Sequence, residues 1–581
     1  MIRSPWAVGA LLVALVLLAY APAFRAGFIW DDDHHVTANP ALRDAHGLAA
    51  LWTTLDATPQ FYPLTHTVLW IQYALWERDP RGYHVVGALL HATSAVLLWR
   101  ILRLLQVQGA WLAAAVFAVH PVHVESVAWI TEQKNTLSAL FYLAAARVFL
   151  GWTERGHRGW TRPIVTSVLF LAALLSKTVT STLPIALGIV LWWKHGRIEK
   201  RELAWLAPLL GIGAILAAVT RHLERTQVGA SGAEWVMTLA ERAALAGRIV
   251  WFYLGKLAWP AKLVFIYPRW APDASTLAGW AGTIAVVALA ASAWALRGRL
   301  GRGPAASLAF FAVTLFPALG FFDVYPMRYS WVADHFQYLA SLGPIVLLSA
   351  AAAVATNRLA SNHPWTRRVA PAVAGLALAA LAGRTFARCH VYADEETLWR
   401  DTVAQNDDAW IAHNNLGILL AQQGKNDEAA KQFERTLTLR PEHTGALANL
   451  GYLQELMGRD DEAALTLARA AAARPSDADA RTHLAHVLFR LHRATEALPV
   501  ALEAARLRPD DPDALADAGA LLLGAGRPAE AIPYLMRALA LRPGFARALS
   551  LLDLARASAP RAGVSYPGGP VPVSPDKETP R

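Results

Sequence analysis

Apolar runs dominate the first two thirds of the chain, and short polar loops separate them. A helix that crosses the hydrocarbon core of a bilayer needs about 20 apolar residues, so the pattern predicts a bundle of about eleven membrane-spanning helices over residues 1–390. We expect the first run to be an uncleaved helix rather than a signal peptide, because no clear small-residue cleavage site follows it. The runs lie near residues 6–23, 84–106, 109–119, 136–152, 163–177, 179–193, 203–220, 277–296, 305–322, 336–356 and 369–386.

Basic residues mark the loops at one end of these runs. The positive-inside rule places such loops in the cytoplasm, so we expect the loop 24–83 and everything after residue 386 to lie outside. The stretch 246–259 must then lie on the outer face or dip into it, because a further span there would break the alternation. The basic residues are Arg3, Arg100, Arg103, Arg155, Arg158, Arg162, Lys194, Arg197, Lys200, Arg201, Arg297, Arg299, Arg302, Arg358, Arg367 and Arg368.

The C-terminal part of the chain repeats every 34 residues, which is the period of tetratricopeptide repeats. Pro441, Pro475, Pro509 and Pro543 keep this interval, as do Ala429, Ala463, Ala497 and Ala531. Small residues let two antiparallel helices approach closely, and a proline ends the second helix of each pair. The pattern predicts a repeat domain over 391–558, with full repeats at 410–443, 444–477, 478–511 and 512–545, a degenerate half-repeat at 396–407 before them and a capping helix after them.

The fold class predicted from these patterns is all-α, with a polytopic membrane helical bundle followed by a soluble α-solenoid. Composition agrees, since hydrophobic residues make up 55% of the chain, charged residues 17%, and the mean hydropathy is +0.30. The net charge of +10 lies in short loops between apolar runs, which favours a membrane protein over a nucleic-acid binder. The single cysteine, Cys389, excludes an internal disulfide and a zinc site built mainly from cysteines. Residues 559–581 are rich in Pro, Gly and Ser, and we expect them to be disordered.

An acidic cluster directly follows the first apolar run. Asp31, Asp32 and Asp33 precede His34 and His35. Adjacent carboxylates repel one another, which raises the pKa of at least one of them and suits a general base. The same carboxylates and histidines could hold a divalent cation. The alternative interpretation is a solvated acidic turn at the end of a helix.

A second polar cluster lies in the outer loop between the third and fourth apolar runs. It contains His120, His123, Glu125 and Lys134. Such a density of histidine, carboxylate and ammonium groups at a membrane surface suits the binding of a polar or phosphorylated headgroup. Its spacing matches no strong zinc-ligand pattern. The alternative is an interfacial loop with ordinary polar residues.

Two histidines lie seven residues apart on one face of the second predicted span. They are His84 and His91, and Tyr62 precedes them in the first outer loop. An ionisable group within a membrane span indicates a functional site by default. The alternative is a histidine that packs against a neighbouring helix, and for His91 the sequence favours that interpretation.

Cations on the predicted outer side depart from the positive-inside trend. Lys177 ends the fifth apolar run, and Arg328 precedes His335 in the last outer loop. Such cations are favourable where they meet an anionic lipid phosphate. The alternative is a long side chain that reaches the interface from a helix end. All of these polar clusters project to one side of the membrane in this topology, as does the repeat domain.

Six short motifs together resemble a known family. In chain order, the sequence contains FIWDD, FYPLT, YH with LLH, HPVHVESVAW, SK and ADHFQYL, followed by the repeats. This order resembles the transmembrane and tetratricopeptide-repeat O-mannosyltransferases and their bacterial relatives, a branch of the GT-C glycosyltransferases. The resemblance covers most of residues 20–560.

The resemblance implies a GT-C-like membrane domain over 1–390 with a catalytic outer loop at 24–83. It also implies a polyprenyl-phosphate sugar donor and transfer of a mannose-like sugar to a serine or threonine of an exported protein. Asp31 and Asp32 match the acidic pair of the family, and one of them would be the base that activates the acceptor hydroxyl. The expected donor-phosphate residues are Lys134, Lys177, Arg328 and His335, and the expected substrate-binding residues are Tyr62, His84, His120, His123 and Glu125.

The chain departs from the family in two motifs. Many relatives carry Tyr-Arg-Pro-Leu, whereas this chain has Tyr62-Pro63-Leu64 without the arginine, so Arg328 or Lys134 would have to substitute for it. Where relatives carry an arginine after Ala-Asp or Ala-Glu, this chain has His335, and a neutral histidine would hold phosphate less firmly.

Two other classes of function compete with the transferase. In a non-catalytic envelope scaffold the repeats would recruit partner proteins, but about eleven spans exceed what an anchor needs. A transporter is less favoured, because the clustered polar groups lie at one surface rather than at the midplane. The low cysteine content and the Ala- and Arg-rich composition indicate a multi-pass protein of a bacterial inner membrane with periplasmic repeats. The partners we expect are the lipid-linked donor, membrane lipid and a protein bound by the repeats.

Overall fold

The computed structural model describes residues 4–58, 60–230, 232 and 235–559, and these residues form helices and turns without a strand. The all-α fold class predicted from the sequence is confirmed. The chain divides into two compact units, Met1–Ala412 and His413–Arg581, and the division lies later than the residue 390 expected from the sequence. The predicted disordered tail, 559–581, lies outside the described residues from 560 onward.

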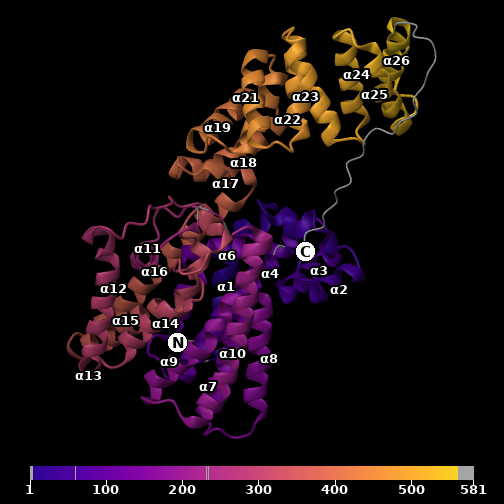
Figure 1. Cartoon of the computed structure of the whole chain (residues 1–581). Helices are drawn as coiled ribbons and strands as arrows, with labels where there is room; N and C mark the ends of the chain where they lie inside the picture. The colour runs from indigo at the N-terminus through magenta and orange to yellow at the C-terminus, as the bar shows by residue number, and fades with distance from the viewer. Residues whose placement is uncertain (1–3, 59, 231, 233–234, 560–581) are drawn as a thin grey trace. The chain divides into compact units, whose positions relative to one another are not determined.

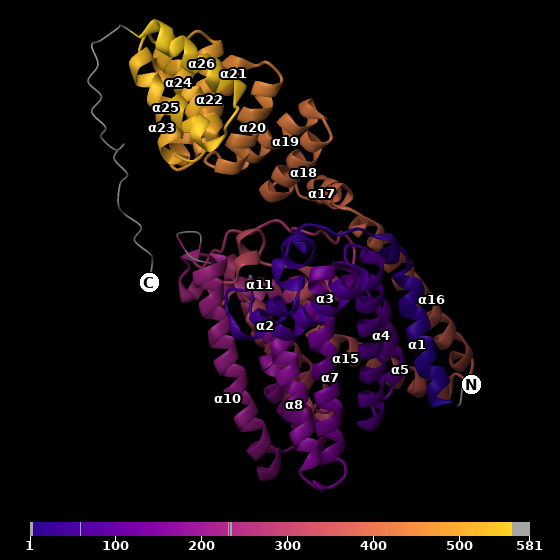
Figure 2. The same cartoon turned by 90° about the vertical axis from the view of Figure 1, so that its right-hand side faces the viewer.

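Long helices joined by short turns form the first unit, and α7, α8 and α10 run side by side in both views (Figures 1 and 2). The helix α7 packs against α4 on one side and α8 on another. The helices are α1 (Pro5–Ala19), α2 (Ala45–Thr53), α3 (Pro63–Trp76), α4 (Pro80–Leu104), α5 (Ala110–Val119), α6 (Val124–Ala128), α7 (Gln133–Thr153), α8 (Thr161–Ser176), α9 (Leu183–His195), α10 (Lys200–Leu223), α11 (Leu239–Ala258), α12 (Leu277–Ala295), α13 (Arg297–Leu300), α14 (Gly303–Leu315), α15 (Leu342–Asn362), α16 (Thr366–Cys389) and α17 (Glu395–Gln405).

Several of these helices are long and apolar enough to cross a membrane. Within the described residues six meet that condition by length and composition, and one bent pair and three shorter apolar helices accompany them. They identify a multi-pass membrane protein, while the count of eleven spans stays a prediction. The six are Pro80–Leu104, Ile130–Thr153, Lys200–Val228, Leu277–Ala295, Leu342–Asn362 and Thr366–Tyr392, and the shorter helices are Pro5–Ala19, Thr161–Ser176 and Gly303–Ala318.

The apolar run at 109–119 does not continue as one straight helix. The helix α5 ends at Val119, and the next helical segment, Pro121–Ala128, is bent from it by 53°. Pro121 has no N–H to donate and forces the preceding residue, His120, into an extended conformation, which ends the helix there. The bend brings the polar sequence after His120 to the start of α7.

The stretch 246–259, expected on the outer face of the membrane, falls almost entirely within α11. This helix has 20 residues but is not among those apolar enough to span. Four charged side chains explain this, since Glu241, Arg242, Arg248 and Lys256 lie along it. Its side of the membrane stays a prediction.

Among the residues that the structure describes, nine helices make up the repeat region, and Figure 2 shows them stacked one after another. A helix pair begins at each of residues 410, 444, 478 and 512, and the last helix ends at residue 558. The helices are α18 (Trp410–Gln422), α19 (Asn426–Leu439), α20 (Thr444–Leu456), α21 (Asp460–Ala473), α22 (Ala478–Arg490), α23 (Ala494–Leu507), α24 (Pro512–Gly524), α25 (Pro528–Leu541) and α26 (Ala546–Ser558).

Glycine in the first helix of a pair lets the second helix approach. A Cβ added at Gly451 would lie 2.6 Å from the Leu467 side chain, and one added at Gly519 would lie 2.6 Å from Leu535. Both leucines are fully buried. The close approach that the 34-residue period predicts is therefore a direct consequence of these small residues.

Candidate active site

A polar cavity of about 330 Å³ lies in the first unit where four polar segments of the chain converge. The first outer loop contributes Asp31 and His35, and the α6–α7 connection contributes Glu125, Glu132 and Lys134. The rest of the lining comes from the neighbourhood of residues 265 and 266 and from 325–336, with Gln60 and Val228 added. The volume is that of a small-molecule site.

The two aspartates of the acidic pair have different environments. Asp32 is fully buried and accepts three hydrogen bonds. Its Oδ2 accepts from the Ile29 N–H at 2.9 Å, and its Oδ1 accepts from the Thr131 N–H at 2.8 Å and the Thr131 hydroxyl at 2.6 Å. Both oxygens are therefore occupied, and Asp32 attaches the first outer loop to the residues just before α7.

Asp31 instead faces the cavity. Its side chain is 30% exposed, and no described residue hydrogen-bonds its Oδ1. Burial raises the pKa of Asp31 to about 6, although the nearby Lys134 opposes the shift. Burial and the charge of Asp31 raise the pKa of Asp32 to about 7. Of the two aspartates, only Asp31 lines the cavity with a partly exposed side chain, as a general base requires.

A buried cluster of charges lies beside Asp31. The Glu132 carboxylate accepts from the Lys134 ammonium at 2.9 Å and from the Lys177 ammonium at 3.0 Å. His335 lies between two glutamates. Its Nε2 is 3.9 Å from a Glu132 carboxylate oxygen, and its Nδ1 is 2.9 Å from a Glu125 carboxylate oxygen. Two ammonium groups thus share the one carboxylate of Glu132, with the Asp31 carboxylate close to Lys134, and of the two lysines Lys134 is the one that lines the cavity.

Aromatic rings form the wall next to the base. Trp30 stacks on Trp129 with ring centroids 5.5 Å apart, and Phe265, Trp399 and Tyr329 meet it edge-on at 5.2–6.0 Å. The backbone of Trp30 has φ of 47°, a left-handed conformation that is strained for a bulky side chain. Such backbone strain persists only where surrounding contacts hold it. Here the aromatic packing around Trp30 fixes the backbone and, with it, the direction in which the next side chain, that of Asp31, points.

The structure brings some of the predicted site residues to the cavity and leaves others outside. Asp31, Glu125, Lys134 and His335 line it, and Lys177 reaches it only through Glu132. The predicted residues that are not part of the lining are Asp32, Tyr62, His84, His120, His123 and Arg328.

The histidines outside the lining are engaged elsewhere. His120 Nε2–H donates to the Leu257 carbonyl at 3.1 Å. His123 Nδ1–H donates to the Phe117 carbonyl at 2.9 Å, and its Nε2 lies 3.0 Å from the Ser341 hydroxyl. His84 is buried on α4. The contacts of His120 and His123 fit structural roles, whereas both ring nitrogens of His84 are buried without a hydrogen-bond partner among the described residues. The expected substrate-binding role of the three histidines has no support from the cavity lining. Arg328 lies against the Trp410 ring at 5.7 Å.

Several lining residues had no recognisable signal in the sequence. Gln60, Phe265 and Ile266 are ordinary loop residues that only the tertiary fold brings together. Among the described residues, no group of three or more His, Cys, Asp or Glu side chains is arranged to hold a metal ion.

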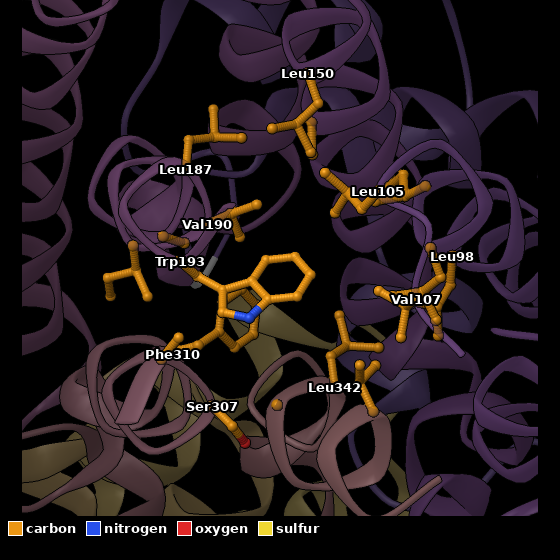
Figure 3. Close-up of a pocket in the computed structure, with 18 of the residues that line it drawn as sticks. Leu98, Leu105, Val107, Leu150, Leu187, Val190, Trp193, Ser307, Phe310 and Leu342 are labelled. Carbon is orange, nitrogen blue, oxygen red and sulfur yellow. The ribbon is translucent and has the colours of Figure 1, made fainter. Parts of the chain in front are cut away.

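A second cavity, of about 190 Å³, is almost entirely apolar. Figure 3 shows Trp193 and Phe310 beside it, with Leu105 and Leu150 across the space and Ser307 at its edge. Leu150 lies 16 residues after Lys134 on α7, so the two cavities are about 24 Å apart along that helix. The apolar cavity is therefore not part of the candidate active site.

Comparison with known proteins fits both units. Residues 58–221 match the sequence model of the dolichyl-phosphate-mannose-protein mannosyltransferase family. Residues 396–441, 414–479 and 482–546 match the tetratricopeptide repeat. Over part of its length the chain is thus similar to protein O-mannosyl-transferases. The resemblance expected from the motifs is thereby confirmed, and the segment matched to the transferase family contains Lys134 and Lys177 but begins after Asp31.

Curated relatives include protein O-mannosyl-transferase TMTC3 of Mus musculus, which is 31% identical over 29% of this chain and 19% of its own length. Protein O-mannosyl-transferase Tmtc1 of Drosophila melanogaster is 32% identical over 30% of this chain and 22% of its own. The matched part therefore spans about a fifth of these relatives. Among solved structures, the tetratricopeptide-repeat protein YrrB is 22% identical and covers 28% of this chain and 93% of its own, with a TM-score of 0.25.

Proposed function

We propose that this chain is a membrane glycosyltransferase. It would move a mannose-like sugar from a polyprenyl-phosphate carrier to an acceptor hydroxyl, expected on a serine or threonine of an exported protein. The observation that carries the proposal is the shared cavity, because the Asp31 carboxylate and the Lys134 ammonium line the same space. The match to dolichyl-phosphate-mannose-protein mannosyltransferases supports the class of donor.

Asp31 has the properties of the base in such a transfer. A pKa of about 6 leaves it ionised at neutral pH and still basic enough to accept a proton in the transition state. The acceptor oxygen forms a bond to the anomeric carbon while its proton passes to Asp31. The bond from that carbon to the phosphate oxygen breaks, and its electron pair leaves with the phosphate.

The lysine cluster suits the leaving phosphate. Lys134 lines the cavity, and Lys177 supports it by sharing Glu132. Fixed cations aimed at developing negative charge stabilise the transition state without reorganisation at the moment of reaction. His335 is engaged by Glu125, so its role would be to hold that part of the wall rather than to carry the phosphate charge alone.

The remaining parts of the proposal concern the setting of the reaction. The repeats would dock the protein acceptor or a partner, since stacked helix pairs provide a long surface for another chain. The topology derived from the basic loops would put the cavity and the repeats on the outer side of a bacterial inner membrane.

The test is transfer of radiolabelled mannose from polyprenyl-phosphate mannose to envelope protein, in membranes with equal amounts of each variant. We expect Asp31→Asn to lower transfer by at least about 100-fold, the lower end of general-base catalysis. Asp33→Asn is the matched control, because Asp33 is exposed and is not part of the cavity lining. Equal transfer in wild type and Asp31→Asn would reject the assignment of Asp31 as the base. Loss of transfer in both Asp31→Asn and Asp33→Asn would show that the effect is not specific to Asp31.

A non-catalytic scaffold is the second candidate function, and the tetratricopeptide matches favour it. In a scaffold, the repeats alone would carry the activity, and Asp31→Asn would have no effect on the recruitment of partners. Measuring protein association and sugar transfer on the same two aspartate variants separates the two functions.

A further inference from the structure

A chain of polar contacts runs from Asp31 away from the cavity. Asp31 Oδ2 lies 3.7 Å from His35 Nε2, and His35 Nδ1 lies 3.3 Å from His66 Nε2. His66 Nδ1 lies 3.0 Å from the Tyr62 carbonyl oxygen. Both histidines are buried, and their rings lie nearly parallel with centroids 5.5 Å apart. His66 belongs to α3, and His35 to the short π-helical segment Asp33–Thr37.

The contact between His66 and the Tyr62 carbonyl determines which nitrogens of the two histidine rings carry a hydrogen. A carbonyl oxygen only accepts hydrogen bonds, so His66 Nδ1 carries a hydrogen. Neutral His66 then has a bare Nε2, which must accept from His35 Nδ1–H. Neutral His35 in turn has a bare Nε2, and this nitrogen faces Asp31. Burial keeps both rings neutral, since it lowers the pKa of His66 to about 4 and that of His35 well below its usual value.

The charges around His35 agree with a neutral ring. Lys134 disfavours an imidazolium, and so do the neighbouring rings of His66 and His34, while Glu132 favours it. Among the described residues, the Asp31 carboxylate lies within ion-pair distance of His35 Nε2, and when ionised it also favours an imidazolium. Because His35 Nε2 carries no hydrogen, it donates no hydrogen bond to the Asp31 carboxylate. Once Asp31 Oδ2 has accepted a proton, it can donate a hydrogen bond to His35 Nε2.

We infer, given the proposed transferase function, that His35 is a positioning residue for the base. Held by His66 and the Tyr62 carbonyl in the tautomer with a bare Nε2, His35 withholds a donor from Asp31 and shares the proton that Asp31 removes from the acceptor hydroxyl. The proton moves from the acceptor oxygen to Asp31 Oδ2, with His35 Nε2 as its second acceptor, while the acceptor oxygen bonds to the anomeric carbon and the bond from that carbon to the phosphate oxygen breaks. The 3.7 Å separation has to shorten by about 0.7 Å in the loaded enzyme, as is common for catalytic hydrogen bonds in ligand-free structures.

The pH profile of kcat/KM for mannosyl transfer by the full-length protein tests this inference. The acidic limb reports the base, and we expect it near pH 6 in wild type. His66→Phe keeps a ring in the stack but removes the acceptor for His35 Nδ1. His35 can then carry its hydrogen on Nε2 and donate to the Asp31 carboxylate. One such hydrogen bond should move the limb about one pH unit toward acid.

Two further variants make the test specific. His66→Gln restores an acceptor near the position of Nε2, so its limb should stay where that of wild type lies. His35→Gln places an amide N–H against Asp31, so its limb should move toward acid even if His66→Phe does not fold. His46→Phe is the control, because His46 is exposed on α2 and outside the cavity lining.

Each outcome decides between alternatives. A limb that does not move in His66→Phe or in His35→Gln overturns the inference. A limb that moves toward alkaline pH in His35→Gln also overturns it, since that result indicates an imidazolium that stabilises ionised Asp31. Failure of the proposed function is distinct, because then wild type shows no transfer at all and there is no profile to compare.

Discussion

Glu132→Gln should destabilise the membrane unit because one buried carboxylate serves two buried ammonium groups. The Glu132 side chain is 2% exposed, and those of Lys134 and Lys177 are 10% and 14% exposed. Glutamine keeps the size of the side chain and one acceptor oxygen but removes the negative charge. The two lysines then repel each other, and only the Asp31 carboxylate near Lys134 and the Glu125 carboxylate near Lys177 still offset their charges.

The magnitude follows from the geometry of the pair. Removing one partner of a buried ion pair costs about 3–5 kcal/mol, and we expect about 3 kcal/mol here because both lysines retain some exposure to water. Lys177→Met leaves Glu132 paired with Lys134, so it should cost only about 1.5 kcal/mol, the value of one charged hydrogen bond.

Unfolding in detergent micelles, followed by tryptophan fluorescence, measures these differences. In the double variant Glu132→Gln with Lys177→Met, one uncompensated charge is gone, so its destabilisation should be at least about 1 kcal/mol less than the sum of the single variants. Glu496→Gln is the control, because its pair with Arg493 is exposed and its loss should not change unfolding of the membrane unit. Strict additivity of the two single variants would refute the shared-carboxylate argument.

Three further perturbations test other parts of the structure. Gly451→Ala should destabilise the repeat region by about 1–3 kcal/mol, because the new Cβ would meet buried Leu467, and circular dichroism melting of the chain checks this. Asp334, which accepts from the Tyr267 hydroxyl, has its pKa raised to about 8 by burial first and by Glu125 second. The protonated acid is therefore favoured by folding, so stability should fall as pH rises from about 4 through 8, and Asp334→Asn should flatten that fall in a series of melting curves. Trp30→Ala should lower transfer while leaving the fold intact, and transfer as fast as wild type would show that the aromatic wall does not orient the base.

The repeat region could be predicted closely from the sequence because its contacts are local. Each pair of helices depends on residues within one 34-residue period, and Gly451 against Leu467 is typical of them. The gathering of the acidic loop, the HPVHVE segment and the last outer loop was also predictable, since the positive-inside rule puts all three on one side. Periodicity and charge distribution suffice for that level of detail.

The roles of single residues within the site were not predictable. Asp31 and Asp32 are adjacent and chemically identical, and only the contacts of Asp32 with Ile29 and Thr131 show which of them is occupied. His120 was a candidate ligand in the sequence, yet the bend at Pro121 turns it toward the Leu257 carbonyl. These outcomes depend on segments more than 90 residues apart in the chain, about which a local pattern carries no information.

The hydrogen bonds of Asp32 hold the base, Asp31, and the cation, Lys134, in one rigid part of the structure. Two hydrogen bonds from Thr131 to Asp32 join the acidic loop to the residues from which α7 and Lys134 follow directly, and a third, from the Ile29 N–H, stays within the loop. Lifting the acidic loop to admit a substrate would break both hydrogen bonds to Thr131. Folding therefore fixes the position of Asp31 relative to Lys134. In each catalytic cycle these two side chains would need little rearrangement before the reaction.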